Sequence, residues 1–192
     1  MLHILHQIAR TRIKTEPPPP PAEEMVVIAR LQKAILTTLG RALTIRHVDA
    51  GSCNGCELEI QALANPYYNL EGIGIRFVAS PRHADMLLVT GPVSKHMAIA
   101  LKRTYDATPE PKLVVAVGDC GCSGGIFGQS YASLGGVASV IPVDVAIPGC
   151  PPAPRALLQG ILAAITAYAP PAPGAATAQA PDRPPPDAHD TP

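Results

Sequence analysis

The sequence predicts an α/β fold in which a mostly parallel sheet is covered by helices on both faces. Several short segments, such as Met86–Thr90 and Leu113–Gly118, are apolar almost without interruption. Such segments are typical of strands that are buried on both faces. Helix-like stretches alternate with them, which is typical of parallel sheets. Apolar residues make up 47% of the 192 residues, enough for the core of one domain.

The elements follow one another in a regular order. Strands are predicted at short apolar or alternating segments, at residues 43–48, 73–79, 86–90, 113–118 and 143–147. Helices are predicted at residues 22–39, directly after Cys56, at 94–105 and at 152–168. The first helix begins with two glutamates that complement the helix dipole, and Gly40 follows its end. We therefore expect residues 23–168 to form the α/β domain.

Two flanking segments differ from this domain in composition. In residues 1–22, apolar residues from Leu2 to Ile8 are spaced as in a short amphipathic helix, and Pro17–Pro21 favour a stiff polyproline II spacer. The helix is either a frayed terminus or a peg that docks on a partner. Residues 169–192 are mainly Pro, Ala, Thr and Asp, a composition that predicts a disordered tail.

Charge and hydropathy exclude several classes of function. The formal net charge is zero, which argues against nucleic acid as the main partner. No apolar run approaches the roughly 20 residues that cross a bilayer. The N-terminus is apolar first and basic afterwards, the reverse of a secretory signal, so we expect a cytoplasmic protein. In a reducing cytosol, five cysteines indicate metal or redox chemistry.

All of the cysteines lie where predicted strands end. Cys53 and Cys56 form a C-x-x-C on a strand-to-helix turn, Cys120 and Cys122 follow the strand at 113–118, and Cys150 follows the last strand. The carboxyl ends of parallel strands share one edge of a sheet, which is where such sheets bind ligands. Four thiolates that converge there can hold a [4Fe–4S] cluster.

A zinc site is the alternative that the cysteines leave open. Structural zinc commonly uses two short-spaced pairs of ligands, but here Cys150 would be left over, and C-x-C is an unusual spacing. Inert buried thiols are disfavoured because the cysteines lie among glycines and prolines. A zinc- or cluster-stabilised assembly module without an electron-transfer role therefore stays as a second class of function.

Four segments occur in an order that identifies a family: Asp49–Glu59, Ser80–Asp85, Gly118–Ile126 and Pro148–Pro152. Together they resemble the 20 kDa subunit family of complex I, which includes the small subunits of membrane-bound [NiFe] hydrogenases. The resemblance covers about residues 1–168. It implies a flavodoxin-like domain with one [4Fe–4S] cluster, bound to a large catalytic subunit on the cytoplasmic side of a membrane complex.

The resemblance also implies the ligands and the branch of the family. Cys53, Cys56, Cys120 and Cys150 match the cluster ligands, and Cys122 is extra. Members that reduce quinone tend to have the first two cysteines adjacent, whereas here Asn54 and Gly55 separate them, as in energy-converting hydrogenases of the formate hydrogenlyase type. The implied function is electron relay to or from a [NiFe] large subunit. A ferredoxin-like subunit and membrane subunits are further implied partners. Electron transfer to quinone in an NADH-quinone oxidoreductase is the alternative.

Two glutamates follow the C-x-x-C. Glu59 matches a family glutamate near the cluster, so it is either a proton relay or a first-turn acid that complements the helix dipole. For Glu57 we expect only the dipole role, and for His47, just before the turn, only a place in a strand.

Overall fold

A single parallel sheet organises the molecule. The structure is a computed structural model that describes residues 2–11, 20 and 22–168. The sheet contains β1 (Leu43–Asp49), β2 (Ile75–Phe77), β3 (Met86–Thr90), β4 (Leu113–Val117) and β5 (Val145–Ile147) in the order β2-β1-β3-β4-β5. All of its neighbouring strands run parallel. This is the strand order of flavodoxin-like folds, so the predicted fold class is confirmed.

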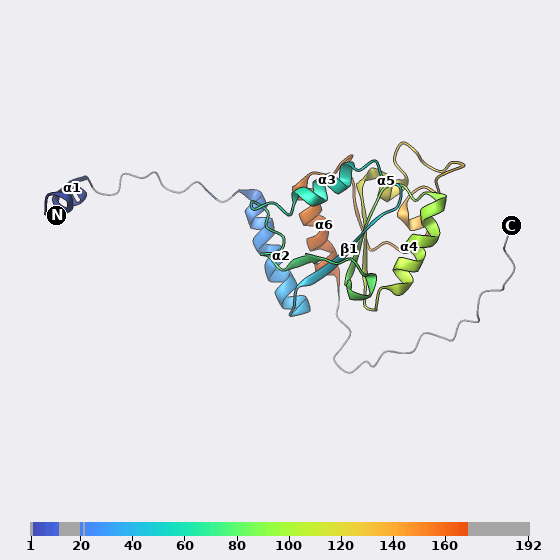
Figure 1. Cartoon of the computed structure of the whole chain (residues 1–192), viewed down its shortest axis with the longest axis horizontal. Coiled ribbons are helices and arrows are strands. Elements are labelled where there is room, and N and C mark those ends of the chain that lie inside the picture. Colours follow the sequence, from blue (N-terminus) through green and yellow to red (C-terminus); the bar gives the residue numbers. More distant parts are fainter. Residues whose placement is uncertain (1, 12–19, 21, 169–192) are drawn as a thin grey trace.

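Helices cover both faces of the sheet, as Figure 1 shows. On one face, α2 (Glu23–Leu39), α3 (Gly55–Ala62) and α6 (Pro154–Ala167) pack in a cluster that contains Met86 and Leu88 of β3. On the other face, α4 (Lys95–Ala107) packs in a second cluster that contains Leu87 and Val89. Alternate residues of one strand thus enter opposite clusters, which explains why β3 is apolar throughout.

Two predicted strands are shorter than expected. β2 begins only at Ile75 because Gly74 has a φ of +89° and the amide of Ile73 bonds within the preceding turn, to the carbonyls of Asn69 and Leu70. β5 begins only at Val145. Just before it, the Asp144 carboxylate accepts the Val114 amide at 2.7 Å, in place of a strand carbonyl.

The segment after β4 also differs from the prediction, which places Cys120 and Cys122 on a loop. It forms a short helix, α5 (Gly118–Ser123). The remaining elements are the 3-10 turns η1 (Pro81–His83) and η2 (Val137–Ser139). The other predicted helices lie within one to two residues of the observed ends.

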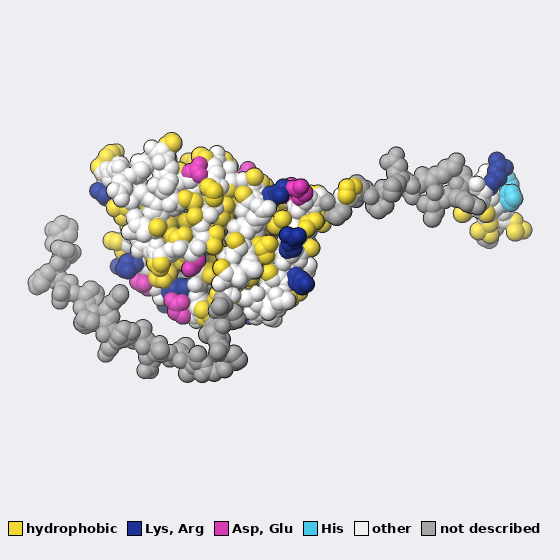
Figure 2. All heavy atoms as spheres, turned by 180° about the vertical axis from the view of Figure 1, so that it is seen from behind, with side chains coloured by type: hydrophobic (Ala, Val, Ile, Leu, Met, Phe, Trp, Pro, Cys, Tyr) yellow, Lys and Arg dark blue, Asp and Glu magenta, His cyan; other side chains and the backbone are white. Residues whose placement is uncertain are grey.

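The N-terminal residues form α1 (Leu2–Thr11), as the apolar spacing predicts. Its large apolar side chains are all exposed: Leu2, Ile4, Leu5 and Ile8. Figure 2 shows the hydrophobic side chains of this helix gathered on one side, away from its basic side chain. The polyproline spacer, apart from Pro20, and the tail at 169–192 lie outside the described residues. Within the part of the chain that is described, no helix is long and apolar enough to span a membrane.

Candidate iron–sulfur site

Four thiols meet at the carboxyl edge of the sheet. A small cavity of about 40 Å³ is lined by Cys53 and Cys56 after β1, Cys120 after β4 and Cys150 after β5. The other residues that line it are Ser52, Gly55, Gly91, Asp119, Gly149 and Pro151. The convergence predicted from the strand ends is therefore present. Only its local form differs, since Cys56 and Cys120 lie on the short helices α3 and α5 instead of on loops.

Polar side chains shape the turn that carries the first two cysteines. The Asp49 carboxylate accepts the amides of Gly51 and Ser52, each at 2.8 Å, which turns the chain at the end of β1. Asn54 then adopts a left-handed conformation with φ of +72° directly before α3. Asparagine tolerates this region better than most residues. The sequence Cys53-Asn54-Gly55-Cys56 thus places one thiol before the helix and one in its first turn.

A two-way hydrogen bond joins the loops of the other two cysteines. The Asp119 amide donates to the Gly149 carbonyl at 2.9 Å, and the Asp119 carboxylate accepts the Gly149 amide at 2.8 Å. Asp119 precedes Cys120, and Gly149 precedes Cys150. The pair therefore fixes the two thiols relative to each other although they are 30 residues apart in sequence.

Glycines leave room for the sulfur atoms. A Cβ on Gly118, whose φ is +80°, would lie 2.7 Å from the Cys56 Sγ, and one on Gly125 would lie 2.8 Å from the Cys120 Sγ. Both distances are too short for any side chain, so only glycine permits these thiols to stay where they are. The cysteine sulfurs thus account for two glycines of the segment 118–125, Gly118 and Gly125.

Cys122 does not join the other four cysteines. Although it is only two residues from Cys120, its half-buried Sγ lies 3.8 Å from the Ala116 carbonyl and does not line the cavity. Spacing in the sequence does not distinguish Cys120 from Cys122 as a ligand. In the structure, only Cys120 of the two lines the cavity.

The thiols interact electrostatically. Burial, then Glu57 and the other three thiols of the cavity, raise the pKa of Cys56 to about 11. Burial, together with Cys150, Cys53 and Asp119, also raises the pKa of Cys120. To be held together as thiolates, these groups would need a positive charge between them, such as bound metal ions supply.

The four thiols that line the cavity are a donor set for either a [4Fe–4S] cluster or a zinc ion. Among the described residues, no three His, Cys, Asp or Glu side chains are grouped closely enough to bind a single ion. In a [4Fe–4S] cluster, each cysteine binds a different iron, so the thiolates stand further apart than around zinc. Four cysteines around a glycine-lined cavity fit a [4Fe–4S] cluster.

The two glutamates of α3 differ in their surroundings. Glu57, expected to be a first-turn acid only, is buried, and neither of its carboxylate oxygens has a hydrogen-bond partner. Glu59 is half-buried and lines neither the thiol cavity nor the cavity around Glu57. Burial raises the pKa of Tyr68, with smaller contributions from Glu24, Tyr67 and Glu59. The buried residues of α3 are Glu57 and Ile60, and the buried Leu63 follows at the same spacing of three residues.

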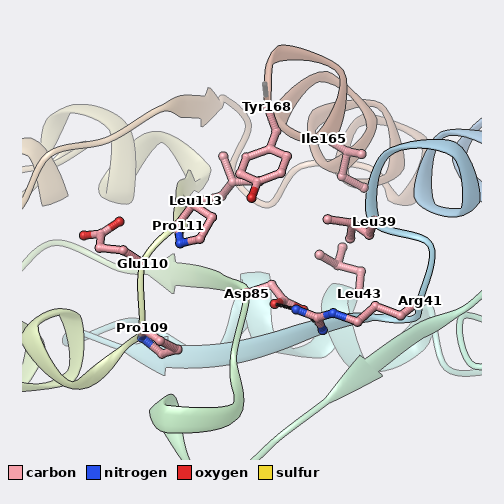
Figure 3. A pocket seen from close by; sticks show the side chains of 10 residues that line it. All are labelled: Leu39, Arg41, Leu43, Asp85, Pro109, Glu110, Pro111, Leu113, Ile165 and Tyr168. Carbon is pink, nitrogen blue, oxygen red and sulfur yellow. Dashed lines mark hydrogen bonds and ion pairs between the residues drawn. The ribbon is translucent and has the colours of Figure 1, made fainter. Parts of the chain in front are cut away.

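A second cavity lies at the edge where the strands begin, and the polar groups in its wall pair with one another. It holds about 130 Å³, and Figure 3 shows the Arg41 guanidinium against the Asp85 carboxylate in its wall. Asp85 also accepts the Thr44 hydroxyl at 2.6 Å and the Thr44 amide at 3.0 Å. Burial by itself would raise the pKa of Asp85, but the hydrogen bonds from Arg41 and Thr44 outweigh it and lower the pKa. These polar groups satisfy one another, and no thiol lines this cavity.

Comparison with known proteins now tests the resemblance. Residues 53–164, more than half of the chain, match the family described as NADH ubiquinone oxidoreductase, 20 Kd subunit. The chain belongs to this family. The matched region contains all five cysteines and everything from α3 to near the end of α6.

Relatives come from more than one branch of the 20 kDa family. The chain is 45% identical to a probable membrane-bound hydrogenase subunit of Pyrococcus furiosus, over 71% of this chain and 83% of that protein. It is also 45% identical to formate hydrogenlyase subunit 7 of Escherichia coli, over 72% of this chain and 54% of that protein. It is 49% identical to an NADH-quinone oxidoreductase subunit of Desulfovibrio desulfuricans, over 66% of this chain and 68% of that protein.

A solved structure agrees with the fold. A chain from the membrane-bound sulfane sulfur reductase, an archaeal respiratory membrane complex, matches with a TM-score of 0.58 and 34% identity, over 76% of this chain and 75% of that one. The relatives are subunits of hydrogenases and quinone oxidoreductases. The prediction of an oxidoreductase subunit with hydrogenase-like and complex I-like relatives is therefore confirmed.

Proposed function

We propose that this chain is the electron-transfer subunit of a membrane-associated, hydrogenase-like oxidoreductase and carries one [4Fe–4S] cluster. Cys53, Cys56, Cys120 and Cys150 would hold the cluster, which supplies one-electron transfer when bound. The observation that carries the proposal is the convergence of these four thiols in a glycine-lined cavity from which Cys122 is excluded.

The surroundings of the cavity suit an electron carrier. Backbone amides and small residues predominate in the loops around the thiols, and hydrogen bonds to cluster sulfurs help to set a reduction potential. Cys53 and Cys150 are exposed at the edge of the sheet, so the site lies at the molecular surface, where electrons can pass to a partner.

Exposed apolar side chains beside this edge support a partner there. Ile126 is 94% exposed, Tyr131 91% and Phe127 54%, and these residues line a shallow hollow together with Gly51 and Ser94. Gly51 belongs to the turn that precedes Cys53. An apolar surface next to the thiols fits contact with a large catalytic subunit. We further propose a ferredoxin-like electron-transfer subunit and membrane subunits as partners, and a cytoplasmic position on the inner face of the membrane.

Glu59 stays a candidate for proton transfer within this proposal. It lies three residues beyond Cys56 and is half-buried, and a carboxyl group at such a place can accept and release a proton. The alternative is that it complements the dipole of α3.

The C-x-x-C spacing favours a [NiFe] partner, which can be tested directly. We expect the native complex, purified anaerobically through a tag on this chain, to contain nickel and to evolve hydrogen from a reduced dye. A nickel-free complex that reduces a quinone would overturn the hydrogenase assignment.

The second candidate function, electron transfer to quinone in a complex I-type enzyme, is favoured by one observation. An NADH-quinone oxidoreductase subunit is 49% identical to this chain, a similarity comparable to that of the hydrogenase relatives. The same purification separates the two. A third outcome, colourless protein with one zinc, would support an assembly module instead.

A further inference from the structure

A cavity separate from the thiol site lies between α3 and the strands β1 and β2. It holds about 480 Å³ and is lined by Arg46, His47, Glu57, Ile60, Gln61, Ala64, Phe77, Val78 and Ala79. None of these residues lines the thiol cavity, although Glu57 directly follows Cys56. Its wall is apolar apart from the first three residues and Gln61, and Phe77 is 40% exposed at it.

Glu57 is the unexplained group in this cavity. Its residue is only 5% exposed, and both carboxylate oxygens are buried without a hydrogen-bond partner. A buried carboxylate without donors is costly, and native proteins nearly always supply a partner. Hydrogen-bond donors for the Glu57 carboxylate must therefore come from outside the described residues.

The neighbouring basic side chains do not fill this role. The Nε2 of His47 lies 3.7 Å from the Glu57 carboxylate, too far for a hydrogen bond, and pairs at 3.0 Å with the Thr90 hydroxyl. Burial lowers the pKa of His47, although Glu57 and Asp49 oppose this effect, so the ring is mainly neutral at pH 7. Arg46 has a buried Nε that itself lacks a partner.

We infer that this cavity receives a basic side chain from a partner subunit, which pairs with the Glu57 carboxylate. Charge complementarity carries the inference, because a guanidinium or ammonium group offers the donors that both oxygens lack. An arginine fits best, since its fork matches two carboxylate oxygens and its planar group stacks on aromatic rings such as that of Phe77. The apolar wall would pack against the methylene stem.

The inference rests on the proposed place of the chain in a multi-subunit complex, but not on the cluster or on nickel. A structure of the intact complex tests it first. We expect a basic nitrogen of another subunit within hydrogen-bond distance of Glu57. A cavity that holds water, a small molecule or an apolar side chain in that complex would overturn the inference.

A pair of matched variants tests the energetic consequence in the same complex. We expect Glu57→Gln to weaken binding of the subunit that contributes the basic residue by more than about tenfold, since removal of one member of a buried charge pair acts mainly on dissociation. Glu71→Gln, at an exposed residue outside the cavity, is the control and should leave binding unchanged. Equal binding for both variants would contradict the inference.

Iron content and the electron paramagnetic resonance signal separate this test from the proposed function. A complex with a cluster but no basic nitrogen at Glu57 would refute the inference alone. A complex without a cluster, but with that nitrogen in place, would refute the proposed function alone. If Glu57→Gln does not fold, the structure of the wild-type complex still decides. If it folds, substituting the partner's basic residue by methionine should reproduce the loss of binding, and the two changes together should cost no more than either one.

Discussion

Gly118→Ala tests whether the glycines of the thiol site are required by the cysteines. Gly118 has a φ of +80°, and an added Cβ would lie 2.7 Å from the Cys56 Sγ. Alanine in the left-handed region costs about 1–2 kcal/mol. In addition, the thiol would have to retreat by about 0.7 Å to reach ordinary contact at 3.4 Å, or the end of β4 would have to move. Either movement displaces a proposed ligand.

The matched control is Gly40→Ala, at the end of α2. Gly40 has a φ of +64°, but a Cβ there would meet no atom within 4 Å. Both variants therefore carry similar backbone strain, and only Gly118→Ala disturbs a cysteine. The assays are denaturant unfolding, iron per chain after anaerobic purification, and electron paramagnetic resonance of the reduced protein.

We expect Gly40→Ala to lose about 1–2 kcal/mol of unfolding free energy and Gly118→Ala at least as much, and only Gly118→Ala to lose more than about half of its iron or to show an altered signal. Full iron content and an unchanged signal in Gly118→Ala would refute the argument that this glycine makes room for a ligand. Equal loss of iron in both variants would attribute the effect to strain alone.

Three further predictions concern other parts of the chain. Glu59→Gln should keep the cluster signal while slowing turnover of the assembled complex, and full activity would assign Glu59 to the helix dipole. Asp85→Asn should lower stability at pH 7 by about 1–2 kcal/mol after allowance for the exposed Arg41. Because the folded-state pKa of Asp85 is lowered, the difference in unfolding free energy between wild type and variant should be complete above the ordinary pKa of 3.8 and disappear as the pH falls through the lowered pKa. Denaturant unfolding at several pH values tests this, and a difference that persisted in acid would contradict it. Truncation after Pro173 should leave iron content and assembly of the complex unchanged, and loss of assembly would show that the tail binds a partner.

The sheet was predictable because each strand carries its own signal. β3 and β4 are buried on both faces, so they are apolar throughout and stand out in the sequence. The first residues of β2 and β5 were not predictable. They depend on the positive φ of Gly74 and on the hydrogen bond from the Val114 amide to the Asp144 carboxylate. Likewise, α5 forms in a glycine-rich segment of low helix propensity. It directly follows β4, and its second residue, Asp119, makes the hydrogen bonds with Gly149.

The site was predictable to the extent that strand ends share an edge. This rule brings the cysteine loops together, but it cannot separate Cys120 from Cys122, which follow the same strand. The structure separates them through the direction of each thiol. The burial of Glu57 could not be predicted from the sequence either, because it depends on how α3 lies against β1 and β2. Glu59 is the same type of residue and lies at a similar distance in sequence from the cysteines.

Counting iron in cysteine variants tests the central claim most directly. The chain would be purified anaerobically with its complex, as wild type and as the Cys53→Ser, Cys56→Ser, Cys120→Ser, Cys122→Ser and Cys150→Ser variants. We predict the same iron content and the same cluster signals in Cys122→Ser as in the wild-type complex, and loss of about four irons per chain, or a converted signal, in each of the other four variants. One zinc in place of iron, or a cluster that requires Cys122 and tolerates Cys120→Ser, would contradict the account.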